Sequence, residues 1–320
     1  MTFVFEPAAV DLGRRHHLGT DVPDGPDDGI APPQFSFLHR SPLLSPRGPK
    51  PPDRQDSLYG VLFEGREPEA TLELISHGIT ATIRNVALLV ADAELLADNH
   101  RYARADYVAA AAKEEMGKLY LMLDMCRLDL SRHENYLKGL CWAFYDHITK
   151  HTYFEYCTLS HAGIQTMSDL GYHFNLTRQK WWPAGAEDGE PDMPNDVHFL
   201  REANLYVGYD DYAEEWAYPE ETHGRILYDP ALSFLGTPIA ETKKVFDRLN
   251  SERERGFFRA ESLGAVNTRF KHHFLKAATP TEELNAMHRR LAGDLAHSLG
   301  ITEEDYMQSA LATWPLYSFI

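Results

Sequence analysis

The sequence predicts an all-α protein, a helical bundle built on one long antiparallel hairpin. Between Thr71 and Cys126, apolar residues recur every three or four positions, which is the spacing of one buried helical face. Start signals for further helices follow at Ser131, Thr237 and Thr302. With 320 residues, of which 43% are hydrophobic, the chain can bury a sizeable core around these helices.

Residues 1–66 differ in composition from the rest of the chain. They hold ten of the 19 prolines, and proline prevents a long helix because it fixes its own dihedral angle and restricts the residue before it. We therefore expect a Pro-rich irregular arm over 1–66. Its aromatic residues indicate a strap that docks on the helical body rather than a disordered tail; they are Phe3, Phe5, Phe35, Phe37 and Tyr59.

The hairpin is expected to consist of two helices with one short break at Asp98 and Asn99. These residue types leave helical geometry at low cost, because they tolerate the left-handed conformation and bond their own backbone. We expect the two helices to run antiparallel and to bury their apolar faces against each other.

The second helix contains a polar motif, Glu114-Glu115-Met116-Gly117-Lys118. The helical period places Glu115 at the apolar seam, where a carboxylate needs a partner because an unpaired buried charge is very costly. Glu114 is expected to face outward and to pair with Lys118, four residues later. Gly117 lowers the helix propensity, which suggests that another backbone approaches closely there.

Further helices are predicted along the rest of the chain. Ser131 and Glu134 form a capping-box pattern that opens a third helix, so His133 lies in its first turn. A long polar and turn-rich insertion follows at about 163–235. Four C-terminal helices are then expected, the third of which Gly300 closes, over residues 238–255, 263–277, 281–299 and 302–313.

Charge and cysteine content limit the function classes. The chain has 48 acidic and 31 basic residues, a net charge of −17, which argues against a protein that coats nucleic acid through bulk positive charge. Three cysteines, an odd number, are expected to be reduced thiols. No apolar run approaches the length of a membrane span, and no secretion signal is apparent at the N-terminus. We therefore expect a cytoplasmic protein.

Several strings resemble the AbiV family of bacterial abortive-infection proteins, which belongs to the HEPN superfamily of small helical domains. They are Ile83-Arg84-Asn85-Val86-Ala87, Asp92-Ala93-Glu94-Leu95-Leu96, Arg101-Tyr102-Ala103-Arg104-Ala105, the Glu114 to Lys118 motif, and Leu200-Arg201-Glu202-Ala203-Asn204-Leu205-Tyr206-Val207 followed by Pro219. The resemblance implies a HEPN-type domain over 67–259 with a helical extension over 260–320. It also implies a homodimer, because HEPN domains commonly pair.

The resemblance further implies a catalytic pair. HEPN nucleases carry an arginine and a histidine separated by four to six residues, and Arg127 and His133 fit this spacing. A histidine can transfer the proton of a ribose hydroxyl, and an arginine can hold the phosphate, so the pair would cleave RNA with no metal or cofactor. The predicted supporting residues are Glu114, Glu115, Lys118 and Arg132.

The residue after Arg127 departs from the usual pattern. It is often polar in active HEPN members, and here it is Leu128. The alternative is therefore a catalytically silent HEPN protein that binds a phage or host protein.

Three other sets of residues rank below this pair. Arg290 and His297 also fit the spacing, but they are typical of a solvated helix face. His147, His151 and Glu155 stand at i, i+4 and i+8 and form a secondary candidate for a metal site. A diiron bundle site lacks the usual Glu-x-x-His pairs on the first two helices; its candidates are Glu94, Glu114, Glu115 and His133.

Overall fold

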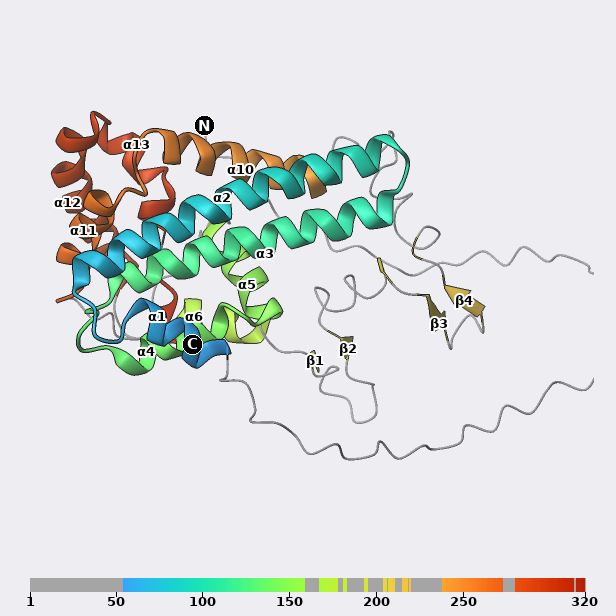
Figure 1. Ribbon diagram of the computed structural model, residues 1–320, viewed down its shortest axis with the longest axis horizontal. Helices are drawn as coiled ribbons and strands as arrows, with labels where there is room; N and C mark the ends of the chain where they lie inside the picture. Colours follow the sequence, from blue (N-terminus) through green and yellow to red (C-terminus); the bar gives the residue numbers. More distant parts are fainter. Residues whose placement is uncertain are drawn as a thin grey trace, which may run out of the picture. The chain divides into compact units, whose positions relative to one another are not determined.

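The computed structural model describes residues 54–158, 167–177, 181–182, 193–194, 204–205, 207–210, 215–217, 219, 238–272, 280–313 and 315–319. Over these residues the protein is all-α, as the sequence predicts, apart from two short strand pairs (Figure 1). The helices are α1 (Arg54–Leu62), α2 (Pro68–Asp98), α3 (Tyr102–Arg127), α4 (Glu134–Ala143), α5 (His147–Thr158), α6 (Met167–Thr177), α10 (Pro238–Glu254), α11 (Ala260–Phe270), α12 (Thr281–Leu299) and α13 (Glu303–Met307). Two 3-10 turns follow, η2 (Ala310–Ala312) and η3 (Tyr317–Phe319).

The hairpin is formed by α2 and α3, which lie antiparallel and side by side (Figure 1). The predicted break is confirmed, since α2 ends at Asp98 and α3 begins at Tyr102. The residue that adopts the left-handed conformation is His100, with a φ of 60°, rather than Asn99, whose φ is −95°. The turn therefore reverses the chain one residue later than the sequence predicts.

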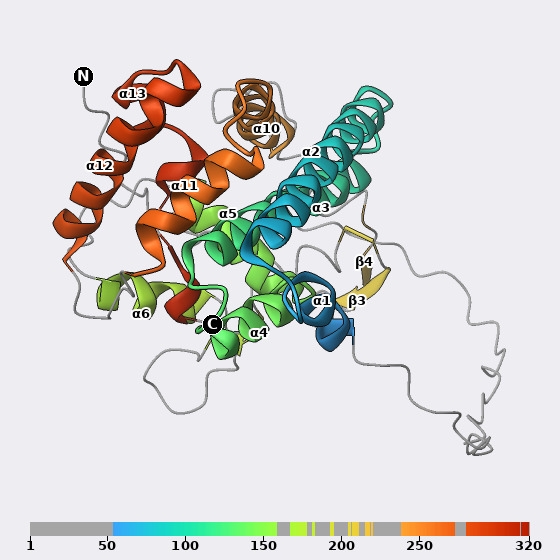
Figure 2. The same cartoon turned by 60° about the vertical axis from the view of Figure 1, so that its left-hand side comes forward.

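Helix α3 lies at the centre of the bundle. It contacts α2, α5, α10 and α11, and Figures 1 and 2 show these helices around it. Nearly every residue from Met116 to Arg127 is consequently buried. A helix that is covered on all sides loses its amphipathic pattern, so the apolar period of this half does not reveal which neighbour each face contacts.

Helix α2 is long and apolar enough to cross a membrane by length and composition, and it is the one such helix in the described part of the chain. In the fold it packs against α3, α10 and α11. Its buried apolar residues from Leu72 to Val90 contribute to the main core, and Ala93 belongs to a smaller cluster with Ala105, Ala109 and Ile239. These contacts are those of the core helix of a helical bundle.

The segment between α3 and α5 differs from the prediction in two ways. The predicted third helix is split, because α4 ends at Ala143 and α5 begins at His147. The Ser131 and Glu134 capping box is absent. Ser131 instead bonds Asp129 through its backbone nitrogen (3.0 Å) and its hydroxyl (2.6 Å), a local turn that competes with a helix cap.

Two predicted irregular segments contain helices. Within the N-terminal arm, α1 forms and packs on α4, where Tyr59 lies under the Lys138 ammonium at 5.0 Å. The other four predicted aromatic anchors lie outside the described residues. Within the 163–235 insertion, α6 forms because Met167, Leu170 and Phe174 are buried at helical spacing.

The two strand pairs are short. Both lie within the predicted polar insertion: β1 (Trp181–Trp182) pairs with β2 (Met193–Pro194), and β3 (Gly208–Asp210) pairs with β4 (Glu215–Ala217), each antiparallel. They do not change the fold class.

The C-terminal helices largely follow the prediction. α12 has the predicted bounds, and Gly300 ends it with a left-handed φ of 63°. Thr302 and Asp305 form a capping box at the start of α13, but this helix ends at Met307 and η2 follows. α11 begins three residues earlier than predicted and ends at Phe270. It packs on the hairpin, and the domain boundary at 259–260 stays a prediction.

Candidate functional site

The carboxylate of Glu114 is the centre of a buried ionic cluster between α3 and α5. Its Oε2 atom lies 2.6 Å from Nδ1 of His147 and 3.2 Å from Nζ of Lys150. Burial by itself would raise the pKa of Glu114, but the hydrogen bond from His147 and the charge of Lys150 outweigh it, so the pKa is lowered. Glu114 is therefore ionised at neutral pH.

The ionised carboxylate fixes the tautomer of His147. A carboxylate only accepts hydrogen bonds, so the proton of the neutral imidazole must lie on Nδ1, and Nε2 is left as a proton acceptor. The side chain of His147 is 49% exposed, whereas that of Glu114 is 11% exposed. This is the arrangement of a general base whose orientation is set by a buried carboxylate.

Gly117 lets α5 approach α3 at this point. A Cβ atom on Gly117 would lie 2.0 Å from the carbonyl oxygen of Lys150, far closer than two such atoms can be. The close approach inferred from this glycine is thus present, and the backbone involved is that of α5. It brings Lys150 within reach of Glu114.

A cavity of about 320 Å³ opens beside the cluster. Its polar lining comes from three helices, and it consists of Asn85, Tyr107, Glu114, Glu115, Lys118, His147, Lys150 and His151. His151 is 8% exposed. Its Nδ1 atom has no hydrogen-bond partner among the described residues, and Glu155 lies 3.7 Å away. The cavity therefore brings together two imidazoles and two ammonium groups.

The predicted roles of Glu114 and Glu115 are reversed. Glu114 is the buried carboxylate, whereas Glu115 is about one-fifth exposed and pairs with Lys118 at 2.5 Å. The prediction assigned the faces from contact with α2 alone, but α5 covers the face on which Glu114 lies. A shift of one residue turns a side chain by about 100° around the helix, which is enough to exchange the two roles.

We expect Glu114→Ala to lower the free energy of unfolding more than Glu115→Ala. Loss of Glu114 leaves the buried Lys150 ammonium unpaired, at a cost of about 2–3 kcal/mol. Loss of Glu115 removes a partly exposed pair worth about 0–1 kcal/mol. Denaturant unfolding of the two variants checks this order. Equal midpoint shifts would contradict it.

Arg127 lies in the core and is 2% exposed. Its guanidinium donates to Oδ1 of Asp124 at 2.6 Å, to the carbonyl of Leu311 at 3.2 Å and to the hydroxyl of Thr313 at 3.1 Å. Asp124 also accepts from the hydroxyl of Tyr153 and from the backbone nitrogen of Leu316. In this arrangement the guanidinium is not available to a phosphate in solvent.

His133 lies nearer the surface, at the start of α4. Its Nδ1 atom accepts from the backbone nitrogen of Asp129 at 3.1 Å, and its ring packs edge-on against Tyr136. Arg132 is exposed and lies 3.5 Å from Asp129. The predicted Arg127 and His133 pair is therefore divided between the interior and the surface.

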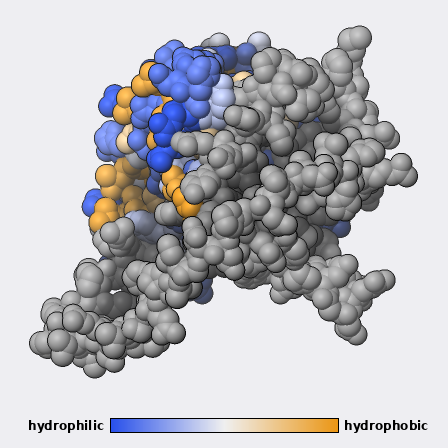
Figure 3. Space-filling view, turned by 90° about the vertical axis from the view of Figure 1, so that its right-hand side faces the viewer, coloured by the Kyte–Doolittle hydropathy of each residue, from blue (hydrophilic) through white to orange (hydrophobic). Residues whose placement is uncertain are grey.

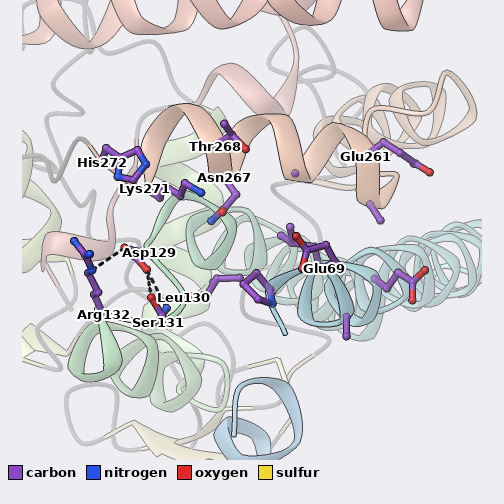
Figure 4. Close-up of a pocket in the computed structure, with 16 residues that line it drawn as sticks. Glu69, Asp129, Leu130, Ser131, Arg132, Glu261, Asn267, Thr268, Lys271 and His272 are labelled. Carbon is purple, nitrogen blue, oxygen red and sulfur yellow. Dashed lines mark hydrogen bonds and ion pairs between the residues drawn. The ribbon is translucent and has the colours of Figure 1, made fainter. Parts of the chain in front are cut away.

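A larger cleft of about 670 Å³ lies between α2, the loop after α3, and α11. Figure 4 shows the basic groups Arg132, Lys271 and His272 at one end, where the carboxylate of Asp129 lies beside Arg132, and the carboxylates Glu69 and Glu261 toward the other end. The cleft therefore offers charged groups of both signs. The pair arranged for proton transfer, however, lies at the smaller cavity.

The secondary candidates are placed as follows. No group of three or more potential metal ligands occurs in the described part of the chain. His147 lies 2.6 Å from Glu114, whereas His151 lies 3.7 Å from Glu155. Arg290 and His297 are exposed on α12, as expected of a solvated face. Glu94 of the diiron set pairs with Lys243 of α10 at 2.6 Å.

Three polar residues of the small cavity were not predicted as site residues from the sequence: Asn85, Tyr107 and Lys150. Asn85 lies in the string Ile83 to Ala87, whose resemblance to the AbiV family was a signal for this position. Lys150 follows His147 by three residues, which places it on the same helical face. Gly117 indicated that some backbone approaches there, but only the fold identifies it as α5.

Comparison with known proteins gives one match. The family model HEPN_AbiV, described as AbiV, matches residues 74–233. This range includes every residue that lines the small cavity between α2, α3 and α5. No curated protein and no solved structure matches the chain.

Proposed function

The chain belongs to the AbiV family of HEPN-type defence proteins, and from this premise we propose that it acts in abortive infection by cleaving RNA in the cytoplasm without a metal ion. The observation that carries the proposal is the hydrogen bond between Glu114 and Nδ1 of His147 at the edge of a cavity. It prepares an imidazole for proton transfer.

His147 acts as the general base. Its Nε2 atom takes the proton of a ribose 2′-hydroxyl, and the oxygen attacks the adjacent phosphorus while the bond to the 5′-oxygen breaks. His151 donates a proton to the leaving 5′-oxygen. The two imidazoles stand one helical turn apart on α5, about 5–6 Å between Cβ atoms. The products are a 2′,3′-cyclic phosphate and a free 5′-hydroxyl.

Lys118 and Lys150 supply positive charge at the cavity. They offset the charge that develops on the phosphate oxygens in the transition state. Both are fixed by carboxylates, Lys118 by Glu115 and Lys150 by Glu114, so little reorganisation is needed during the reaction. This gives the Glu-Glu-x-Gly-Lys motif a role in each of its polar positions.

The proposal is tested by expressing His147→Ala, which we expect to abolish toxicity and RNA cleavage. The imidazole is half exposed, so the variant should fold. His297→Ala, an exposed histidine of α12, is the matched control and should be as toxic as the wild type. Cleavage should persist in a chelator, and the RNA should end in 2′,3′-cyclic phosphates. A folded His147→Ala protein with full toxicity would refute this site.

His133→Ala separates this site from the predicted Arg127 and His133 pair. That pair requires Arg127 to leave its internal partners before it can meet a phosphate. Loss of cleavage in His133→Ala with retention in His147→Ala would assign the reaction to the Arg-His pair.

A second candidate function is binding without catalysis. It is favoured by the burial of Arg127 and Leu128 and by the cleft of Figure 4, which offers charged groups of both signs to a segment of a phage or host protein. In that case none of the histidine variants would alter toxicity, and cellular RNA would stay intact.

We also propose a homodimer that pairs through the outer face of α2. Four exposed apolar residues repeat there at heptad spacing; they are Ala81, Leu88, Ala91 and Leu95. Leu88 is 66% exposed and Leu95 is 62% exposed. In Figure 3, hydrophobic residues stand beside hydrophilic ones on the part of the surface that is shown in colour.

Light scattering should therefore give the mass of a dimer at micromolar concentration. Replacing both Leu88 and Leu95 by glutamate should give a monomer, because four charges would meet at the interface. Val61→Glu, at an exposed apolar position on α1, is the control and should stay dimeric. A wild-type monomer would contradict the proposal.

A further inference from the structure

Two large aromatic side chains are exposed where α4 ends and the chain turns into α5, which begins at His147. Trp142 is 42% exposed and Tyr145 is 39% exposed. The turn is fixed by hydrogen bonds from the backbone nitrogen of Tyr145 to the carbonyl of Trp142, and from that of Asp146 to the carbonyl of Ala143. The two aromatic residues therefore lie in the hydrogen-bonded segment that directly precedes the proposed base.

A chain of contacts connects this turn to the cavity. Lys118, which lines the cavity, lies with its ammonium 5.3 Å above the ring of Phe144. The ring of Phe144 packs edge-on against that of Tyr145, with centroids 5.8 Å apart. Tyr145 is thus one ring removed from a cation of the proposed site.

We propose that Trp142 and Tyr145 stack the unpaired bases of single-stranded RNA, which makes single-stranded RNA the substrate class; this rests on the function proposed above. Bases inside an A-form duplex are already stacked on each other and cannot reach a protein ring. Unpaired bases can, and stacking on an aromatic side chain is largely independent of sequence.

The net charge of the protein limits the ways in which it could hold RNA. A chain with a net charge of −17 repels a polyanion in general, so it cannot depend on many phosphate contacts for affinity. Stacking provides affinity without positive charge. The few cations at the cavity, Lys118 and Lys150, then need to hold only the phosphate that reacts.

The closing experiment measures binding separately from cleavage. The probe is a short fluorescent single-stranded RNA whose 2′-hydroxyls are methylated, so that it cannot be cleaved, and the readout is anisotropy at fixed salt. We expect Trp142→Ala and Tyr145→Ala each to weaken binding by roughly 5- to 100-fold. Trp142→Phe and Tyr145→Phe, which keep a ring, should restore most of it.

The controls distinguish this inference from the proposed function. Tyr136 lies on α4 with Trp142, but its ring packs against that of Tyr317, so Tyr136→Ala should bind the probe like the wild type. A duplex of the same sequence should bind poorly. His147→Ala should bind the probe normally although it does not cleave RNA.

Three outcomes would overturn the inference. They are no binding by the wild type, equal binding of the duplex, and unchanged binding by the double variant Trp142→Ala with Tyr145→Ala. If that double variant binds RNA but is no longer toxic, the two aromatic residues contact a protein partner instead. Cleavage that still depends on His147 would leave the proposed function standing in each case.

Discussion

Arg127→Ala is expected to destabilise the protein by about 3–5 kcal/mol, the usual cost of breaking a buried ion pair from one side. The variant leaves the carboxylate of Asp124, which is 1% exposed, without its cation in the core. The carbonyl of Leu311 and the hydroxyl of Thr313 lose their donor as well. Denaturant unfolding measures the change.

Arg132→Ala is the matched control for this loss. Arg132 is five residues further along the chain, and its side chain is 79% exposed, so its removal should change stability little. Replacing both Asp124 and Arg127 by uncharged residues should cost less than the sum of the two single changes, since no lone charge remains. If Arg127→Ala and Arg132→Ala unfold alike, Arg127 does not hold the interior contacts described above.

Gly117→Ala is expected to destabilise the protein by about 3 kcal/mol or more, at the upper end of the range for overpacking. The added Cβ would meet the carbonyl oxygen of Lys150 at 2.0 Å and its carbonyl carbon at 2.7 Å. Both belong to the backbone of α5, so no side chain can turn away to make room. The gain in helix propensity, about 1 kcal/mol, is smaller than this clash.

Gly293→Ala measures the gain in helix propensity without a clash. Gly293 lies within α12, and a Cβ atom there would meet no atom of the described residues within 4 Å, so the substitution should stabilise the protein by about 0.4–1 kcal/mol. Opposite signs for the two glycine variants are the expected result. Gly117→Ala should also reduce activity, because the clash would push α5 away from α3 and so separate His147 and Lys150 from Glu114. A stabilised Gly117→Ala protein would contradict the close approach of the two helices.

The sequence predicted helices well where one face is buried and the other is solvated. The break at Asp98, the start of α10 at Pro238 and the end of α12 at Gly300 all agree with the fold. Each depends on residues that act locally, through a cap, a proline or a left-handed glycine. Such signals lie within one turn of the position they determine.

The candidate site was less predictable because it depends on which helices meet. Glu114 and Glu115 are neighbours in sequence, and only the position of α5 decides which of them is buried. Arg127 looks like a helix-end cation in the sequence, yet its partners Leu311 and Thr313 are 184 and 186 residues away. No local pattern contains that information.

The long separation between Arg127 and these partners has a consequence for how the protein is made. Asp124 receives a hydrogen bond from the backbone of Leu316, 192 residues later, so its full set of partners exists only after most of the chain has left the ribosome. Contacts between such distant segments form slowly, because a long loop must close first. During synthesis the Asp124 and Arg127 pair of the hairpin therefore forms before it has all of its final hydrogen-bond partners.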